Sequence, residues 1–370
     1  MRAFRFVAVL AALAGCAQRD AARLCAPALP SIPAGYSDQD APLPAHFLGT
    51  SEGTVAFSDR TPRDRATTNW GATLGRVLFY DVRLSADDRV ACASCHLQAL
   101  GFGDTLARSP GIHGRLPRRR TLALANARFN AYGRYRWDES AASLEAQVLL
   151  PIADRNEMDL PLPLLEAKLS RTRYYPALFT AAFGSPAITR DRVAEALAQF
   201  VRSLVSSRSS FDSMFATGGA PDPRRVSPQV LEGFALFDAV GCHNCHRTIA
   251  YFADKSSNIG LDSVPADSGA GQGRFKPASL RNVAVRPPFM HDGRFATLRD
   301  VVAFYDHGVR ASPSLDLRLL ATDGTPRRLH LSQRQQEALV AFLTALTDSS
   351  FLRDARFSDP FPCAPARRRS

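Results

Sequence analysis

The feature that most constrains this chain is a pair of Cys-x-x-Cys-His motifs. They read Cys92-Ala-Ser-Cys95-His96 and Cys242-His-Asn-Cys245-His246. In each motif the two thiols can form thioether bonds to the vinyl groups of a haem, and the adjacent His can ligate the iron. The alternative is zinc, since two Cys-x-x-Cys pairs can make one four-thiolate site. The long stretch between the pairs, and the His that directly follows each, favour two covalently bound haem c groups.

Apolar residues recur at helical spacing around both motifs. A first helix is predicted from Thr73 to a point before the first motif, and a last one from Ser332, which is spaced from Gln335 as in a capping box. The other predicted helices cover 144–150, 162–169, 192–205, 228–238 and 298–305. Residues 97–135 and 253–274 are rich in Gly and polar residues and are predicted to be loops. The sequence therefore predicts a mainly α fold of two cytochrome c-like helical haem domains, with long loops and little β structure.

A stretch dense in Gly, Pro and charge over 217–228 is the predicted linker between these domains. It separates an N-terminal haem domain, 46–220, from a C-terminal haem domain, 228–350. A tail, 351–370, follows. Residues 17–45 are rich in Pro and Ala and are predicted to form a tether.

The N-terminus carries a secretion signal. Arg2 and Arg5 precede a short apolar stretch over 6–13, which is too short to span a bilayer. Leu13-Ala-Gly-Cys16 then resembles a bacterial lipoprotein cleavage site, so residues 1–16 are predicted to be a signal peptide and lipobox, with Cys16 carrying lipid. Ala17 follows, which favours the outer membrane and a periplasmic location. The alternative is a plain secretory signal.

Of the seven cysteines, Cys25 and Cys363 remain after the haem motifs and Cys16 are assigned. In an oxidising compartment they are predicted to form a disulfide that joins the two ends of the chain. The alternative is two unpaired thiols.

The formal net charge is +11. An exported protein has no nucleic acid to bind, so the basic surface can instead attract an acidic redox partner or anionic lipid. A solvated basic surface with no dedicated partner is the alternative.

The ligand on the second face of each iron separates an enzyme from an electron carrier, because peroxide chemistry needs an open position. The residue types alone leave several candidates open. They are Met290, His113, Met214, His291, His307 and Tyr305.

The two motifs, together with the segment from Leu280 to Leu298 that contains Pro-Pro-Phe-Met-His-Asp-Gly, resemble the bacterial di-haem cytochrome c peroxidase family. The resemblance covers roughly residues 70–348 and includes the MauG-like branch, which oxidises side chains in partner proteins. It implies a haem-dependent peroxidase or oxidase.

By this resemblance, hydrogen peroxide reacts at the haem on His96. Gln147 and Glu157 match the distal Gln and Glu of the family, and a carboxylate over the iron can move a proton between the peroxide oxygens. Trp137 matches the indole that lies between the haems. Without the resemblance, Glu157 reads as a surface carboxylate and Trp137 as a core residue.

On the second haem, held by His246, the resemblance places the sixth ligand at Tyr305, as in the MauG-like branch. A hard oxygen ligand favours Fe(III) and higher states, whereas a thioether favours Fe(II). The alternative is that Tyr305 packs in the core and Met290 binds.

Two positions depart from the family pattern. The loop His that many peroxidases hold over the first haem falls on Ile112, and His113 next to it is the alternative ligand there. The family also keeps a calcium ion between the haems, with an Asn side chain among its ligands. That position is Arg120, itself a cation, which disfavours calcium, although peptide carbonyls near Arg286 and Pro288 can still contribute.

Two functions follow. The first is a periplasmic peroxidase or oxidase that draws electrons from a small redox protein (a cytochrome or cupredoxin) or from a side chain of a protein substrate. The second is a lipid-anchored di-haem electron-transfer cytochrome without peroxidase activity.

Overall fold

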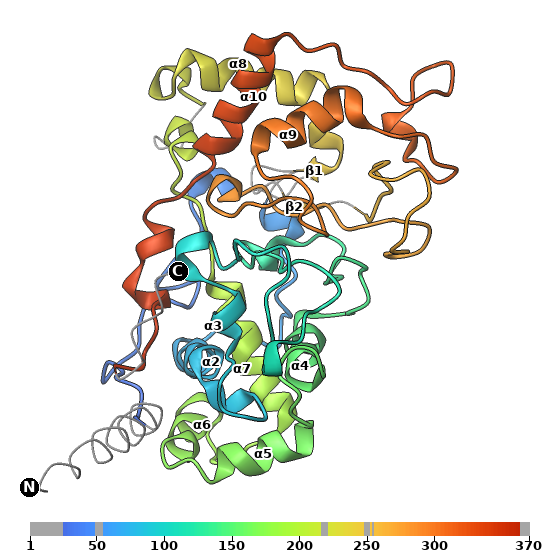
Figure 1. Cartoon of the computed structure of the whole chain (residues 1–370). Helices are drawn as coiled ribbons and strands as arrows, with labels where there is room; N and C mark the ends of the chain where they lie inside the picture. Colours follow the sequence, from blue (N-terminus) through green and yellow to red (C-terminus); the bar gives the residue numbers. More distant parts are fainter. Residues whose placement is uncertain (1–24, 49–54, 216–220, 248–251, 254, 363–370) are drawn as a thin grey trace, which may run out of the picture.

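The computed structural model describes residues 25–48, 55–215, 221–247, 252–253 and 255–362. Figure 1 shows two lobes, one above the other, that follow each other along the chain. The N-terminal lobe contains α2 (Asn69–Tyr80), α3 (Cys92–Cys95), α4 (Leu144–Ala153), α5 (Leu162–Ser170), α6 (Tyr175–Phe183) and α7 (Arg190–Ser203).

The C-terminal lobe is smaller. It contains α8 (Pro228–Ala239), α9 (Leu298–Ala303), a π-helix (Phe304–Gly308) that continues α9, and α10 (Gln333–Ala345). Within the described residues the only sheet is an antiparallel pair of two-residue strands, β1 (His246–Arg247) and β2 (Phe252–Ala253). The predicted mainly helical fold with little β structure is confirmed.

Each lobe is built on one close helix pair. In the N-terminal lobe a Cβ on Gly75 of α2 would lie 1.9 Å from the backbone oxygen of Ala196 on α7. In the C-terminal lobe a Cβ on Gly233 of α8 would lie 1.9 Å from the backbone oxygen of Ala338 on α10. Only glycine permits so close an approach. Each helix pair therefore depends on one glycine at its point of contact.

Most predicted helices are present, with ends that differ by a few residues. The capping box of α10 is confirmed, since the Ser332 hydroxyl accepts a hydrogen bond from the Gln335 backbone and the Gln335 side chain accepts one from Ser332. Helix α6 was not predicted, because Tyr175–Phe183 is apolar nearly all round and shows no amphipathic period.

The two ends of the described chain pack together on the N-terminal lobe. Ala28 donates a backbone hydrogen bond to Pro360, at 2.8 Å. Tyr36 and Phe357 are buried in the same hydrophobic cluster, with ring centroids 6.3 Å apart. Both the segment predicted as a tether and the C-terminal tail therefore contribute to the core of this lobe.

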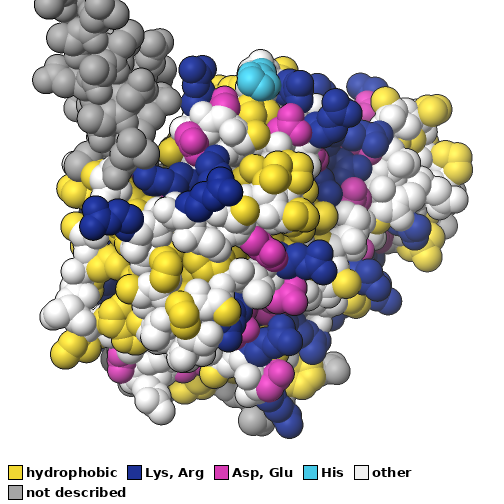
Figure 2. Space-filling model, turned by 90° about the horizontal axis from the view of Figure 1, so that it is seen from below, with side chains coloured by type: hydrophobic (Ala, Val, Ile, Leu, Met, Phe, Trp, Pro, Cys, Tyr) yellow, Lys and Arg dark blue, Asp and Glu magenta, His cyan; other side chains and the backbone are white. Residues whose placement is uncertain are grey.

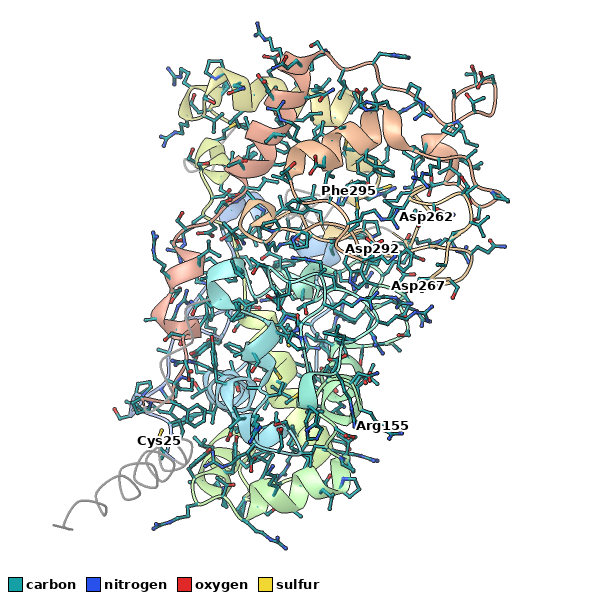
Figure 3. All side chains as sticks on the ribbon, viewed as in Figure 1. Cys25, Arg155, Asp262, Asp267, Asp292 and Phe295 are labelled. Atoms are coloured by element: carbon teal, nitrogen blue, oxygen red, sulfur yellow. The ribbon has the colours of Figure 1, made fainter. Side chains whose placement is uncertain are left out.

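Ion pairs connect the lobes on the loop side of the molecule. Arg119 contacts Asp138 of its own lobe, at 2.5 Å, and Asp267 of the other, at 2.8 Å. Figure 3 shows Asp267 on this side, together with Asp262 and Asp292. These contacts hold the loops that lie between the two lobes.

The excess positive charge is not gathered in one place on the face shown in Figure 2, where Lys and Arg side chains alternate with Asp and Glu. None of the described helices is both long and apolar enough to cross a bilayer. The predicted lipid-bearing Cys16 and the predicted disulfide partner Cys363 lie outside the described residues. Cys25 is described and forms no disulfide with another described residue.

Candidate haem sites

The first motif lines a cavity of about 430 Å³ in the N-terminal lobe. Helix α3 begins where the backbone of Ala91 donates a hydrogen bond to the Ser94 hydroxyl, at 3.0 Å, so a residue inside the motif caps the helix. This single turn places Cys92, Cys95 and His96 on the cavity wall. Burial raises the pKa of both thiols to about 12, which suits uncharged sulfur in an apolar wall.

His96 is oriented for ligation. Its Nδ1 lies 2.9 Å from the backbone oxygen of Phe102. Because a carbonyl only accepts, Nδ1 carries the proton and Nε2 keeps its lone pair for a metal. Burial lowers the pKa of His96, which keeps the ring neutral. The cavity, the two thiols and this ring together fit a covalently bound haem.

Gln147 and Glu157 line the same cavity, Gln147 from α4 and Glu157 from the turn that follows it. The side-chain oxygen of Gln147 is buried and has no hydrogen-bond partner among the described residues. The pKa of Glu157 is raised, first by burial and then by Asp154, against the opposing charge of Arg136. An unpartnered acceptor and a carboxyl that is easily protonated therefore face one space.

A loop positions Glu157 from behind. Ile112 donates a backbone hydrogen bond to the carbonyl of Glu157, at 2.7 Å. A Cβ on the preceding Gly111 would lie 2.5 Å from that same carbonyl and 2.1 Å from the carbonyl of Asn156. Ile112 is buried, whereas His113 is exposed and does not line the cavity. The geometry therefore does not favour His113 as a ligand of the first iron.

The second motif lines a separate cavity of about 200 Å³ in the C-terminal lobe, with Cys242, Cys245 and His246 on its wall. Burial lowers the pKa of His246 to about 4, so the ring is neutral and can ligate a metal. Tyr305 and Met290 both line this cavity. Burial raises the pKa of Tyr305.

The other candidate ligands differ in position. His291 also lines the second cavity. Met214 packs in the hydrophobic core of the C-terminal lobe and lines neither cavity, and His307 is largely exposed beside Asp306. Met214 and His307 are thus excluded by geometry.

Trp137 lines both cavities, which fits the predicted place between the haems. Its indole N–H donates to the backbone oxygen of Arg120, at 2.7 Å. The backbone N–H of Lys276 donates to the carbonyl of Trp137, at 2.8 Å. Trp137 is therefore held from both lobes, its indole by Arg120 and its backbone by Lys276.

Three buried cations surround this junction, and the sequence pointed to the charge of Arg120 alone. Burial lowers the pKa of Arg120 to about 10, of Arg286 to about 9 and of Lys276 to about 7. All three line both cavities. Lys276 is one of three lysines beside 43 arginines, but this rarity indicates no place in the fold.

The four thiols line two separate cavities, so they do not form one zinc site. A calcium ion beside Arg120 does not fit either. The guanidinium of Arg120 donates to the backbone oxygens of Asp104 and Arg286. A second cation at the same oxygens would be repelled. No group of three or more His, Cys, Asp or Glu side chains in the described part of the chain is arranged to hold a metal ion.

These observations define a c-type cytochrome with two haem pockets joined through one indole, one pocket carrying a carboxyl and an amide. The family model "Di-haem cytochrome c peroxidase" matches residues 69–219. The methylamine utilization protein MauG of Methylorubrum extorquens is 35% identical over 300 residues, which cover 77% of this chain and 80% of that protein. The chain therefore belongs to the di-haem cytochrome c peroxidase and MauG family.

Other relatives support the same family assignment. The cytochrome c551 peroxidase of Nitrosomonas europaea is 30% identical over 243 residues, 62% of this chain and 71% of that protein. The crystal structure of a MauG-like protein associated with microbial copper homeostasis has a TM-score of 0.73 at 27% identity and covers 87% of this chain and 99% of that one. The predicted family and enzyme class are confirmed: the chain is a haem-dependent oxidoreductase, and its family implies two haem c groups.

Proposed function

We propose that hydrogen peroxide reacts in the cavity of His96 and that the site of His246 exchanges electrons with the substrate. The observation that carries this proposal is the asymmetry of the two cavities. The first is lined by the unpartnered oxygen of Gln147 and by Glu157, whereas the second is lined by Tyr305 and Met290.

A haem held by Cys92, Cys95 and His96 would supply an iron that can bind peroxide and reduce it. Glu157 takes a proton from the nearer peroxide oxygen and returns it to the departing one, as a general base and then a general acid. Its raised pKa suits both roles, because the carboxyl releases and regains a proton easily. The side-chain oxygen of Gln147 accepts a hydrogen bond from the peroxide and orients it.

Tyr305 is the proposed ligand of the second iron, since a hard oxygen favours its higher oxidation states. Trp137 passes electrons between the two sites. The electrons come from a small redox protein, or from a side chain of a protein substrate. The names of the relatives include both a cytochrome c551 peroxidase and MauG, so both donors are candidates.

The proposed location is the periplasmic face of the outer membrane, through lipid on Cys16. The contact between Ala28 and Pro360 supports a disulfide between Cys25 and Cys363. Cys25 lies three residues before Ala28 in the sequence, and Cys363 lies three residues after Pro360. In cell fractionation, Cys16→Ser should move the protein from the membrane to the soluble periplasmic fraction. An unchanged distribution contradicts the anchor.

The deciding experiment is a peroxide titration of the oxidised protein with both haems attached, followed by absorbance. Glu157→Gln should slow the reaction by about 10²–10⁴-fold, the usual contribution of a general acid–base group. Glu232→Gln is the matched control, since Glu232 pairs with Arg334 on the surface and lines neither cavity. Two low-spin haems that do not respond to peroxide would instead identify an electron-transfer cytochrome.

A further inference from the structure

Three consecutive residues, Tyr135, Arg136 and Trp137, line the first cavity. In an extended strand neighbouring side chains point to opposite sides, so three in a row on one wall need a change of backbone direction. Arg136 supplies this change through a left-handed backbone, with φ of 70°. Such a backbone is uncommon for a residue other than glycine and costs free energy. Local strain therefore accompanies the placement of an arginine on this wall.

The second cavity is lined by the same device. Phe289, Met290 and His291 all line it, and Met290 has a left-handed backbone with φ of 73°. Like Arg136, Met290 directly follows the first residue of a short antiparallel bridge. The same backbone turn thus places a cation in the first cavity and an uncharged thioether in the second.

The charge of Arg136 is not neutralised by the protein. Its guanidinium forms no hydrogen bond or ion pair with any described residue. The other five cations that line the first cavity do have partners: Arg118 and Arg119 pair with Asp267, and Arg120, Lys276 and Arg286 donate to backbone oxygens. Of the described side chains on this wall, Arg136 is thus the cation available to a ligand.

Arg136 and Glu157 act on one another across this cavity. The positive charge of Arg136 lowers the pKa of Glu157, against burial and the charge of Asp154. The two side chains nevertheless form no ion pair, although both line the same space of about 430 Å³. A small ligand in this space can therefore meet a carboxyl and a guanidinium together.

We propose that Arg136 makes the first cavity a binding site for small monovalent anions. This inference rests on the proposed reaction with peroxide and names the species that Arg136 binds there. When Glu157 takes a proton from hydrogen peroxide, the proton stays on the carboxyl and the hydroperoxide anion remains, with no electron transferred. Arg136 donates a hydrogen bond to this anion and stabilises it, because such a bond is stronger to an anion than to neutral peroxide.

Fluoride tests the site without peroxide. It is titrated into the oxidised protein with both haems attached, and its binding is followed by absorbance. Arg136→Leu should weaken fluoride binding by about 10- to 100-fold, the usual contribution of a hydrogen bond to a charged group. Arg136→Gln, which removes only the charge, should weaken it in the same direction, and Arg136→Lys should keep most of the affinity.

Two controls separate charge from space. Nitric oxide is a neutral ligand, so its affinity should be the same in the parent and in all three variants. Arg118→Leu is the matched variant, since Arg118 lines the same cavity but pairs with Asp267, at 3.2 Å, and its side chain is 64% exposed. It should leave fluoride binding unchanged.

The titration is repeated in the Glu157→Gln background, because loss of Arg136 also raises the pKa of Glu157. The effect of Arg136→Leu should persist there. The inference is overturned if the effect vanishes in that background, or if nitric oxide binding falls as much as fluoride binding. It is also overturned if fluoride binding never depends on Arg136, the result expected if this guanidinium pairs with a carboxylate of the haem itself.

The inference and the proposed function can fail separately. If fluoride binding depends on Arg136 while peroxide gives no reaction, the proposed function fails and the anion site stands. If fluoride binding does not depend on Arg136 while Glu157→Gln slows the peroxide reaction, the anion site fails and the proposed function stands.

Discussion

The indole of Trp137 lies edge-on to the imidazole of His291, with ring centroids 6.3 Å apart and planes at 68°. Each ring stands two residues beyond the start of a short antiparallel bridge, which joins Tyr135 to Ala141 in one lobe and Phe289 to Phe295 in the other. The carbonyl of each accepts a 2.8 Å hydrogen bond from the opposite lobe, from Lys276 to Trp137 and from Arg120 to His291. The two lobes thus meet at a matched pair of aromatic residues.

We expect Trp137→Phe to keep both haems but to slow the passage of electrons between them. The phenyl ring preserves packing and is harder to oxidise than indole. Loss of the hydrogen bond to Arg120 should cost about 1 kcal/mol of stability. Stopped-flow absorbance of the second haem after peroxide is added measures the effect. His291→Phe is the comparison, and a larger delay in that variant than in Trp137→Phe would assign the route to His291.

The rate of the peroxide reaction should fall as pH falls through the pKa of Glu157, because only the ionised carboxyl can take a proton. That pKa is raised by burial and by Asp154, and lowered by Arg136. Asp154→Asn should therefore move the acid limb of the pH–rate profile to lower pH, and Arg136→Gln should move it to higher pH. Shifts in the same direction for both variants would show that another group controls the limb.

The sequence predicted the parts of the site that lie on regular elements or at positions matched to the family. Gln147 and Trp137 line the first cavity, although spacing alone would not have selected them. Lys276 and Arg286 were missed because each is buried beside a loop without periodicity. Lys276 donates to the carbonyl of Arg134, at 2.7 Å, and such a contact between distant loops leaves no pattern in the chain.

The repeat between the lobes was predicted only as a plan of helix, motif, loop and further helices. At the level of single residues, Asn126 and Asn282 match: both have left-handed backbones, and each donates its backbone N–H to the residue just after the long helix of its lobe. Such contacts emerge only in three dimensions.

Removal of divalent metal should leave the protein unaffected. Since the guanidinium of Arg120 already contacts the carbonyls of Asp104 and Arg286, elemental analysis should find no stoichiometric calcium. Dialysis against a chelator should leave the haem spectra and the peroxide reaction unchanged. Loss of activity that calcium restores would contradict this prediction.

Gly111→Ala should impair the peroxide reaction while leaving the second haem unaffected. The added methyl would stand 2.1 Å from the carbonyl of Asn156, so the turn that carries Glu157 must shift. Gly114→Ala is the matched control in the same loop. A Cβ there meets nothing within 4 Å, although its φ of +72° adds some strain. Equal loss of peroxide reactivity in the two variants would show that the loop as a whole, rather than contact with Glu157, is responsible.

A buried ion pair should dominate the stability of the contact between the turn Phe211–Phe215 and the C-terminal lobe. Arg281 is fully buried and contacts both oxygens of Asp212, at 2.5 and 2.8 Å, while His46 contacts the same carboxyl at 3.1 Å. Although burial alone would raise the pKa of Asp212, the charge of Arg281 and these hydrogen bonds hold it well below its usual range.

Arg281→Met should therefore lower the free energy of unfolding by about 3–5 kcal/mol at neutral pH, because it leaves a buried charge without its partner. A group whose pKa is lowered on folding contributes stability that is lost as pH falls through its folded pKa. The difference between Arg281→Met and the parent should thus shrink in acid, when Asp212 is protonated. Thermal denaturation at several pH values measures it, with the exposed Arg334→Met as the control that changes Tm little. A difference between Arg281→Met and the parent that does not vary with pH would show that the lost stability comes from packing around Arg281 and not from the charge of Asp212.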